Sequence, residues 1–194
     1  MRPNTVYISS LLKKKFPTAA KELISVLDKH NIIVKELTNT KDIWCRDYMP
    51  IQNRLGELVQ FKYNPSYLKG KKEWEESRSD VHIVCETNGI KPIYSDINID
   101  GGNIVLYNDK AILTDRIFIE NPNYDKDKLI AELECLLKAK IIVIPAIKQT
   151  LRVMLMVWCA LLTRIRFLET ILTLNISTFE TELTKSAKRT DFHI

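Results

Sequence analysis

Residues 43–50 read IWCRDYMP and residues 98–103 read NIDGGN. Each stretch is a short polar turn that follows an apolar run, and each supplies one carboxylate, Asp47 and Asp100. The pair Gly101-Gly102 permits positive φ and allows a close approach of the backbone. The two turns therefore predict that successive strands present an acidic side chain at corresponding places.

Two carboxylates on turns at strand ends suit a planar cation such as a guanidinium, which accepts bidentate pairing. Trp44 adds a flat apolar wall, and Pro50 stiffens the exit of the first turn. Each turn alone is also typical of a structural feature: Arg46–Asp47 of an ion pair, and residues 100–103 of a hairpin or bulge. Their matching places in a repeat favour a binding site.

The composition indicates a folded globular domain without nucleic-acid or membrane partners. The 194 residues are 45% hydrophobic and 27% charged, with a net charge of +5. Most lysines are scattered; the clusters at residues 13–15 and 69–72 are typical of solvated faces, so we expect no nucleic-acid binding. In the apolar run 153–162, the arginines and the glutamate that follow interrupt the pattern before membrane-spanning length.

Four cysteines are widely spaced, and only three histidines occur, so the sequence predicts no metal site and no disulfide framework. The chain starts directly with an expected strand and has no apolar signal region, which favours a cytoplasmic location. We expect Cys85 and Cys135 to lie on helices in the core. His30 and His82 are expected on or after helices, at the surface.

The first 149 residues predict an α/β fold in which strand–helix–strand units recur about every fifty residues. A plain α/β sandwich with chance spacing is the alternative. We expect helices at residues 18–29, 73–88 and 125–138. The expected strands cover residues 5–9, 32–37, 49–53, 58–63, 91–97, 103–107, 110–114 and 140–145.

Residues 150–194 form a tail of different character, which contains none of the five glycines and seven prolines. A buried or interfacial helix is the ordinary interpretation. Reading the codons of residues 152–159 one base earlier allows Gly-His-Ala-Asp-Gly-Met-Val instead. A His-x-Asp turn would then appear at the third expected position, so we interpret the tail as an out-of-frame product of one base lost near codon 149.

The motifs Trp44-x-Arg46-Asp47-x-x-Pro50 and Asp100-Gly101-Gly102-Asn103, with the out-of-frame Gly-His-x-Asp-Gly, resemble the agmatine deiminase and bacterial-type peptidylarginine deiminase family of the pentein superfamily. The resemblance covers residues 1–149. It implies a partial α/β propeller with about three of five ββαβ units. It also implies a small guanidinium substrate such as agmatine, no metal and no organic cofactor.

The resemblance further implies a role for each matching residue. Asp47 would bind the guanidinium nitrogens and Trp44 would line the pocket. Asp100 would orient a catalytic histidine, although many relatives carry Glu there. Arg46, Gly101, Gly102 and Asn103 would be structural residues of the motifs.

The nucleophilic cysteine and the acid–base histidine of the family have no in-frame counterpart in this sequence. Cys45 lies inside the first motif, but no histidine is near it in the repeat, so we do not expect it to be the nucleophile. We expect the chain to be an inactive, truncated deiminase that self-associates through uncovered sheet surface. The alternatives are a short guanidinium-binding protein, or a family member acting on peptidylarginine or arginine.

Overall fold

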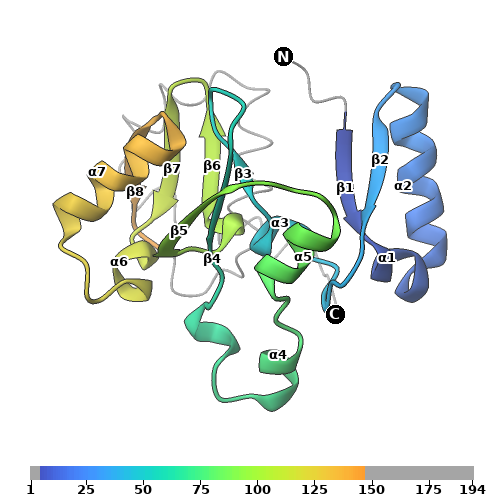
Figure 1. The fold of residues 1–194 in the computed structure, drawn as a ribbon, viewed down its shortest axis with the longest axis horizontal. Helices are drawn as coiled ribbons and strands as arrows, with labels where there is room; N and C mark the ends of the chain where they lie inside the picture. The colour runs from blue at the N-terminus through green and yellow to red at the C-terminus, as the bar shows by residue number, and fades with distance from the viewer. Residues whose placement is uncertain (1–4, 147–194) are drawn as a thin grey trace, which may run out of the picture. The chain divides into compact units, whose positions relative to one another are not determined.

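The structure is a computed structural model that describes residues 5–146. All the helices and strands below belong to one compact unit, Met1–Ile144. Within the described residues the fold is mixed α/β, with one two-stranded and two three-stranded sheets (Figure 1). The tail interpreted as out of frame, residues 150–194, lies outside the described residues.

The first sheet pairs β1 (Thr5–Ser9) with β2 (Ile33–Leu37) in parallel. The connection contains α1 (Ser10–Lys15) and α2 (Pro17–Lys29). The sequence predicted one helix here, and the structure adds α1, because the Ser9 side chain accepts a hydrogen bond from the backbone N–H of Leu11 and caps a new helix.

The second sheet has the order β3 (Ile51–Gln52), β4 (Leu58–Lys62) and β5 (Ile93–Asn98). The connection between β4 and β5 contains η1 (Ser66–Leu68), α4 (Lys72–Glu76) and α5 (Val81–Thr87). A single helix over 73–88 was therefore a wrong prediction. The helix is broken because Asp80 accepts hydrogen bonds from the backbone N–H groups of His82 and Ile83 and starts α5.

The third sheet repeats this arrangement with β6 (Ile104–Tyr107), β7 (Lys110–Thr114) and β8 (Lys140–Ile144). The helices α6 (Arg116–Glu120) and α7 (Lys126–Leu137) connect β7 to β8. In each three-stranded sheet the first two strands are antiparallel and the last two are parallel. The predicted repeat of strand, helix and strand is therefore present in all three sheets.

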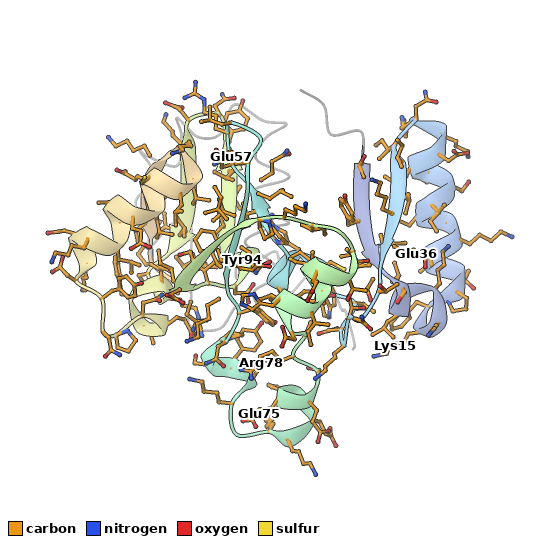
Figure 2. All side chains as sticks on the ribbon, in the orientation of Figure 1. Lys15, Glu36, Glu57, Glu75, Arg78 and Tyr94 are labelled. Carbon is orange, nitrogen blue, oxygen red and sulfur yellow. The ribbon has the colours of Figure 1, made fainter. Side chains whose placement is uncertain are left out.

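Within the described residues, an apolar core cluster is shared by the second and third sheets and α7. Its members include Val59, Ile97, Ile104, Leu113 and Leu133, each fully buried. The labelled charged side chains Lys15, Glu36, Glu57 and Glu75 lie at the surface (Figure 2).

Two cysteines on helices differ in their burial. Cys85 is buried as predicted, but Cys135 is exposed, because it lies on the outer side of α7, whose buried residues are Leu129, Leu133 and Leu137.

Among residues 5–146, no helix combines the length and apolar character that crossing a membrane requires.

Candidate functional site

The first motif forms a single helical turn, α3 (Cys45–Tyr48), between β2 and β3. Trp44 precedes this turn with about half of its surface exposed (53%). Tyr48 is buried and donates a hydrogen bond from Oη to the carbonyl oxygen of Asp42 at 2.8 Å. The Gln60 amide donates to the carbonyl oxygen of Tyr48 at 3.0 Å, so both sides of the turn are fixed.

The second motif forms η2 (Gly101–Asn103), which Asp100 caps. One carboxylate oxygen of Asp100, Oδ1, accepts a hydrogen bond from the Gly102 N–H at 2.8 Å. The Asn103 side chain accepts hydrogen bonds from the backbone N–H and the hydroxyl of Thr114, at 3.1 and 2.7 Å. Asn103 therefore ties the turn to β7.

The two motif turns lie against each other, backbone to backbone. A Cβ atom on Gly101 would lie 2.1 Å from the carbonyl oxygen of Arg46 and 3.5 Å from that of Asp47. Gly101 is thus required for a close approach. Gly101 does not have the positive φ that glycine permits. Among the described glycines, a positive φ occurs at Gly56, Gly70 and Gly89. A helical turn at residues 101–103 needs no left-handed backbone.

Arg46 connects the turns through its side chain, because its Nη2 donates to the carbonyl oxygen of Ile104 at 2.6 Å. Burial of the guanidinium lowers the pKa of Arg46, while the charges of Asp47 and Asp100 oppose that shift. Arg46 as a whole residue is exposed, and the end of its side chain is held at the partly buried bond to Ile104. Both predicted site acids lie close enough to this guanidinium for their charges to act on it.

The cysteine inside the first motif is not set up as a nucleophile. Burial raises the pKa of Cys45, and its Sγ lies 3.5 Å from the Tyr48 hydroxyl. A protonated thiol is a poor nucleophile. The exposed His82 is stacked on Tyr94 with ring centroids 4.4 Å apart, and His30 ends α2, so both lie where the sequence predicted.

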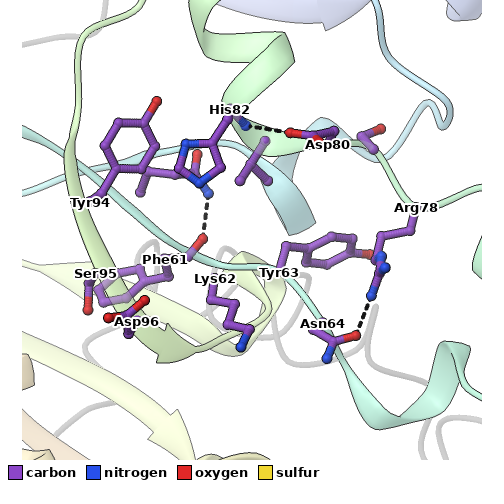
Figure 3. A pocket seen from close by; sticks show the side chains of 13 residues that line it. Phe61, Lys62, Tyr63, Asn64, Arg78, Asp80, His82, Tyr94, Ser95 and Asp96 are labelled. Carbon is purple, nitrogen blue, oxygen red and sulfur yellow. Dashed lines mark hydrogen bonds between the residues drawn. The ribbon is translucent and has the colours of Figure 1, made fainter.

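An open hollow of about 540 Å³ lies between β4, β5 and the start of α5 (Figure 3). Among its labelled lining residues are Lys62, Arg78, His82 and Asp96, and Arg78 donates a hydrogen bond to Asn64. Neither Asp47 nor Asp100 is among the described residues that line it. Tyr63 lines this hollow and also lies near enough to Asp47 and Asp100 for their charges to raise its pKa.

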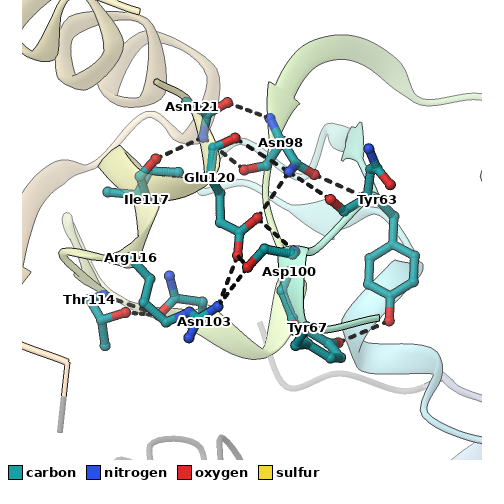
Figure 4. Close-up of polar contacts among 12 residues, drawn as sticks. Tyr63, Tyr67, Asn98, Asp100, Asn103, Thr114, Arg116, Ile117, Glu120 and Asn121 are labelled. Carbon is teal, nitrogen blue, oxygen red and sulfur yellow. Dashed lines mark hydrogen bonds and ion pairs between the residues drawn. The ribbon is translucent and has the colours of Figure 1, made fainter. Parts of the chain in front are cut away.

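Two tyrosines that the sequence analysis missed lie beside the acids. Tyr67 donates a hydrogen bond from Oη to Oδ2 of Asp100 at 2.9 Å, and the Tyr63 and Tyr67 hydroxyls are 3.1 Å apart (Figure 4). Burial raises the pKa of Tyr63, and the charges of Asp100 and Asp47 raise it further. The available signal was two tyrosines four residues apart directly after β4, at the same end as the motifs.

A polar network holds the segment that carries Tyr67 (Figure 4). The Glu120 carboxylate accepts hydrogen bonds from the Ser66 N–H at 2.9 Å, the Ser66 hydroxyl at 2.7 Å and Arg116 at 2.9 Å. Asn98 accepts from the Asn64 N–H at 2.8 Å. These contacts fix residues 64–66 to β5 and α6, and thereby fix the position of Tyr67.

Among the described residues, no group of three or more His, Cys, Asp or Glu side chains is placed to hold a metal ion. Asp47 and Asp100 instead lie near Arg46 and Tyr63, on which the charges of both acids act. Carboxylates can bind an organic cation through charge-assisted hydrogen bonds.

A family profile described as Porphyromonas-type peptidyl-arginine deiminase matches residues 3–150. Among solved structures, a variant of C. jejuni agmatine deiminase with substrate bound is 14% identical, with a TM-score of 0.53 and coverage of 74% of this chain and 53% of that chain. Another structure of C. jejuni agmatine deiminase is 14% identical, with a TM-score of 0.52 and coverage of 77% and 55%. At this identity the likeness shows the fold alone. The chain spans about half the length of these structures, and no curated protein matches it.

Proposed function

The chain belongs to the Porphyromonas-type peptidyl-arginine deiminase family, and from this membership we propose that it is part of an enzyme that hydrolyses a guanidinium. The observation that carries the proposal is the contact between Gly101 and the backbone of Arg46 and Asp47. This contact brings two acidic turns, 53 positions apart from Asp47 to Asp100, to one place.

The repeated sheets support a pentein propeller as the finer description of the fold. Residues 51–98 and residues 104–144 each contain an antiparallel pair followed by a helical crossover to a parallel strand. Residues 5–37 contain the crossover and the parallel pair. We propose that these are about three of the five ββαβ units of such a propeller.

We propose that Asp47 binds the guanidinium nitrogens, that Trp44 lines the pocket and that Asp100 orients the acid–base group. The half-exposed indole of Trp44 is available to a ligand, and a planar cation stacks well on such a ring. Arg46, by contrast, is a structural residue. Its hydrogen bond to Ile104 holds the first turn against the start of β6.

The reaction would convert agmatine to N-carbamoylputrescine and ammonia, by attack of a thiolate and proton transfer through a histidine. Water and the side chains supply everything that this hydrolysis needs, so no cofactor is proposed. The raised pKa of Cys45 argues against a nucleophile among the described residues of the first motif. We therefore propose that the 194-residue chain binds a guanidinium without hydrolysing it.

The alternatives differ in substrate and in class. Peptidylarginine and free arginine carry the same guanidinium, and the paired acids do not distinguish them from agmatine. A short protein whose only role is to bind a guanidinium would share Asp47 and Asp100. The gene separates this last alternative, because a binding protein needs an intact reading frame after codon 149. Cytoplasmic location and self-association also remain proposals.

The experiment is an assay of the purified chain with agmatine and with a peptidylarginine substrate, followed by colorimetric detection of ureido product. We expect no product, and measurable turnover would overturn the inactive assignment. Calorimetric titration with agmatine should show binding that Asp47→Asn abolishes, because the neutral amide loses the charge that pairs with the guanidinium. Putrescine, which lacks the guanidinium, is the control ligand. Equal binding of both ligands would contradict a guanidinium site.

A further inference from the structure

The hydroxyls of Tyr63 and Tyr67 and the Asp100 carboxylate form a continuous chain of hydrogen bonds. The two phenol oxygens are 3.1 Å apart, and the Tyr67 oxygen is 2.9 Å from Oδ2 of Asp100. Both tyrosine side chains are partly buried. The three groups come from two segments, residues 63–67 and the turn at residue 100, which the fold brings together.

These hydrogen bonds can all be donated in one direction only, because each phenol carries a single proton. Tyr67 donates its proton to the carboxylate, so its oxygen can only accept from Tyr63. The Tyr63 hydroxyl is protonated, and therefore a donor, at neutral pH, because a phenol has a pKa near 10 and burial raises the pKa of Tyr63 further. Hydrogen bonds arranged in series polarise one another and become stronger together.

The hydrogen bonds fix the orientation of the Asp100 carboxylate. Its Oδ1 accepts from the Gly102 N–H at 2.8 Å, and its Oδ2 accepts from Tyr67. With one donor on each oxygen, rotation of the carboxylate about its terminal torsion breaks at least one bond. The remaining lone pairs of the carboxylate are then oriented before any ligand arrives.

The segment that carries Tyr67 is itself held rigidly. Glu120 accepts two hydrogen bonds from Ser66, the residue next to Tyr67 in the chain. Arg116 also pairs with Glu120 at 2.9 Å, and its partner carboxylate is only 11% exposed. The donor for Asp100 is thus positioned by a partly exposed ionic network in which Glu120 is the most buried side chain.

We propose that Tyr67, supported by Tyr63, is a positioning residue that holds the Asp100 carboxylate, and that this held carboxylate, besides its proposed role toward the acid–base group, adds negative charge that favours the binding of a guanidinium ligand. The proposal rests on the proposed function and deepens it, because neither tyrosine belongs to the two motifs. Its effect on the ligand passes through Asp100. The role therefore predicts an energetic coupling between residues 67 and 100 in binding.

The experiment is a double-mutant cycle on the 194-residue chain, with agmatine as the ligand in calorimetric titrations. Tyr67→Phe, which removes only the hydroxyl, should raise the Kd by up to about tenfold, the value of a hydrogen bond to a charged group, because a carboxylate that is no longer held must be ordered when the ligand binds. Tyr63→Phe should raise it about threefold, by removing the second donor. In an Asp100→Ala background, Tyr67→Phe should cause no further change. Tyr107→Phe, on the exposed end of β6, is the matched control and should bind as the native chain does.

Thermal melting of the four proteins of the cycle (the native chain, Tyr67→Phe, Asp100→Ala and the double variant) supplies a readout without ligand. The melting temperatures should also be non-additive, because the Tyr67–Asp100 bond exists in the unliganded chain. Equal effects of Tyr67→Phe in both backgrounds, in Kd and in melting, would overturn the proposal. Coupled melting together with no agmatine binding by the native chain would instead overturn the guanidinium site itself, and with it any positioning role for Tyr67. A native Kd for Tyr67→Phe would refute the positioning role while leaving the guanidinium site intact.

Discussion

The carbonyl oxygen of Arg46 lies 2.1 Å from the point where a Cβ atom on Gly101 would stand. No side chain fits into that space, so the two motif turns pack directly through their backbones. This contact, and the hydrogen bond from Arg46 to Ile104 at 2.6 Å, make the second and first motifs one structural unit. Substitutions at the junction should therefore affect stability and ligand binding together.

Gly101→Ala tests the backbone contact. The added methyl group would meet backbone atoms that cannot rotate away, and overpacking of this kind costs about 1–3 kcal/mol. We expect a lower urea midpoint and weaker agmatine binding. Gly70→Ala is the control, because nothing lies within 4 Å of its Cβ position, so only its positive φ of 83° is penalised. Gly70→Ala should lower the midpoint without changing the Kd; native-like agmatine binding by Gly101→Ala would contradict the packing argument.

Arg46→Lys tests the internal guanidinium. Lysine keeps the positive charge but lacks the forked donor that reaches Ile104, so we expect a loss of about 1–3 kcal/mol in unfolding free energy. Arg46→Met should be worse, because it leaves Asp47 and Asp100 without the charge that acts between them. Equilibrium urea unfolding of the three proteins gives the order directly. If Arg46→Lys unfolds like the native chain, the bond to Ile104 contributes nothing.

Glu120→Gln tests the network that holds the Tyr67 segment. Burial alone would raise the pKa of Glu120, but hydrogen bonds from Ser66 and Arg116 outweigh it and lower the pKa below its ordinary value of 4.5. The ionised form therefore stabilises the fold above about pH 4.5, and this stabilisation is lost as the pH falls through the lower, folded-state pKa. We expect Glu120→Gln to cost about 1–2 kcal/mol at neutral pH, by weakening hydrogen bonds to a charged acceptor.

The measurement is the melting temperature of the native chain and of Glu120→Gln across the acid range. The difference between them should be constant near neutrality and should shrink as the pH falls below 4.5. Glu22→Gln, on the exposed face of α2, is the control and should melt like the native chain at each pH. A gap that persists unchanged in acid would show that the charge of Glu120 is not what stabilises the segment.

Limited alkylation with iodoacetamide tests the reactivity of the cysteines. Among the cysteines of residues 5–146, Cys135 is exposed and should be modified first. Cys45 should react slowly, because burial raises its pKa, and Cys85 should react slowest, because burial raises its pKa to about 11. Peptide mass spectrometry after short exposures gives the order, and labelling in urea should remove the differences. Faster labelling of Cys45 than of Cys135 would reopen its assignment as a nucleophile.

The elements that the sequence predicted correctly are those with strong local signals. The strands at residues 5–9 and 110–114 and the helix α7 follow from apolar periodicity and from the Asp125 cap. The break at Asp80 was missed because a capping side chain competes with helical continuity, and apolar spacing does not reveal which prevails. The Tyr67–Asp100 bond joins residues 33 positions apart through a fold-dependent contact, so no local pattern announces it.

The gene sequence near codon 149 tests the interpretation that the reading frame shifts there. The family profile matches up to residue 150, close to codon 149, where the composition changes and a shifted reading allows a Gly-His-Ala-Asp-Gly-Met-Val turn. We expect the gene, sequenced on both strands, to encode that turn in the alternative frame. Restoring the missing base should then produce a longer chain that hydrolyses agmatine or another guanidinium, with the 194-residue chain as the inactive control. An intact frame without the His-x-Asp turn in any neighbouring frame would end this interpretation and favour the short binding protein.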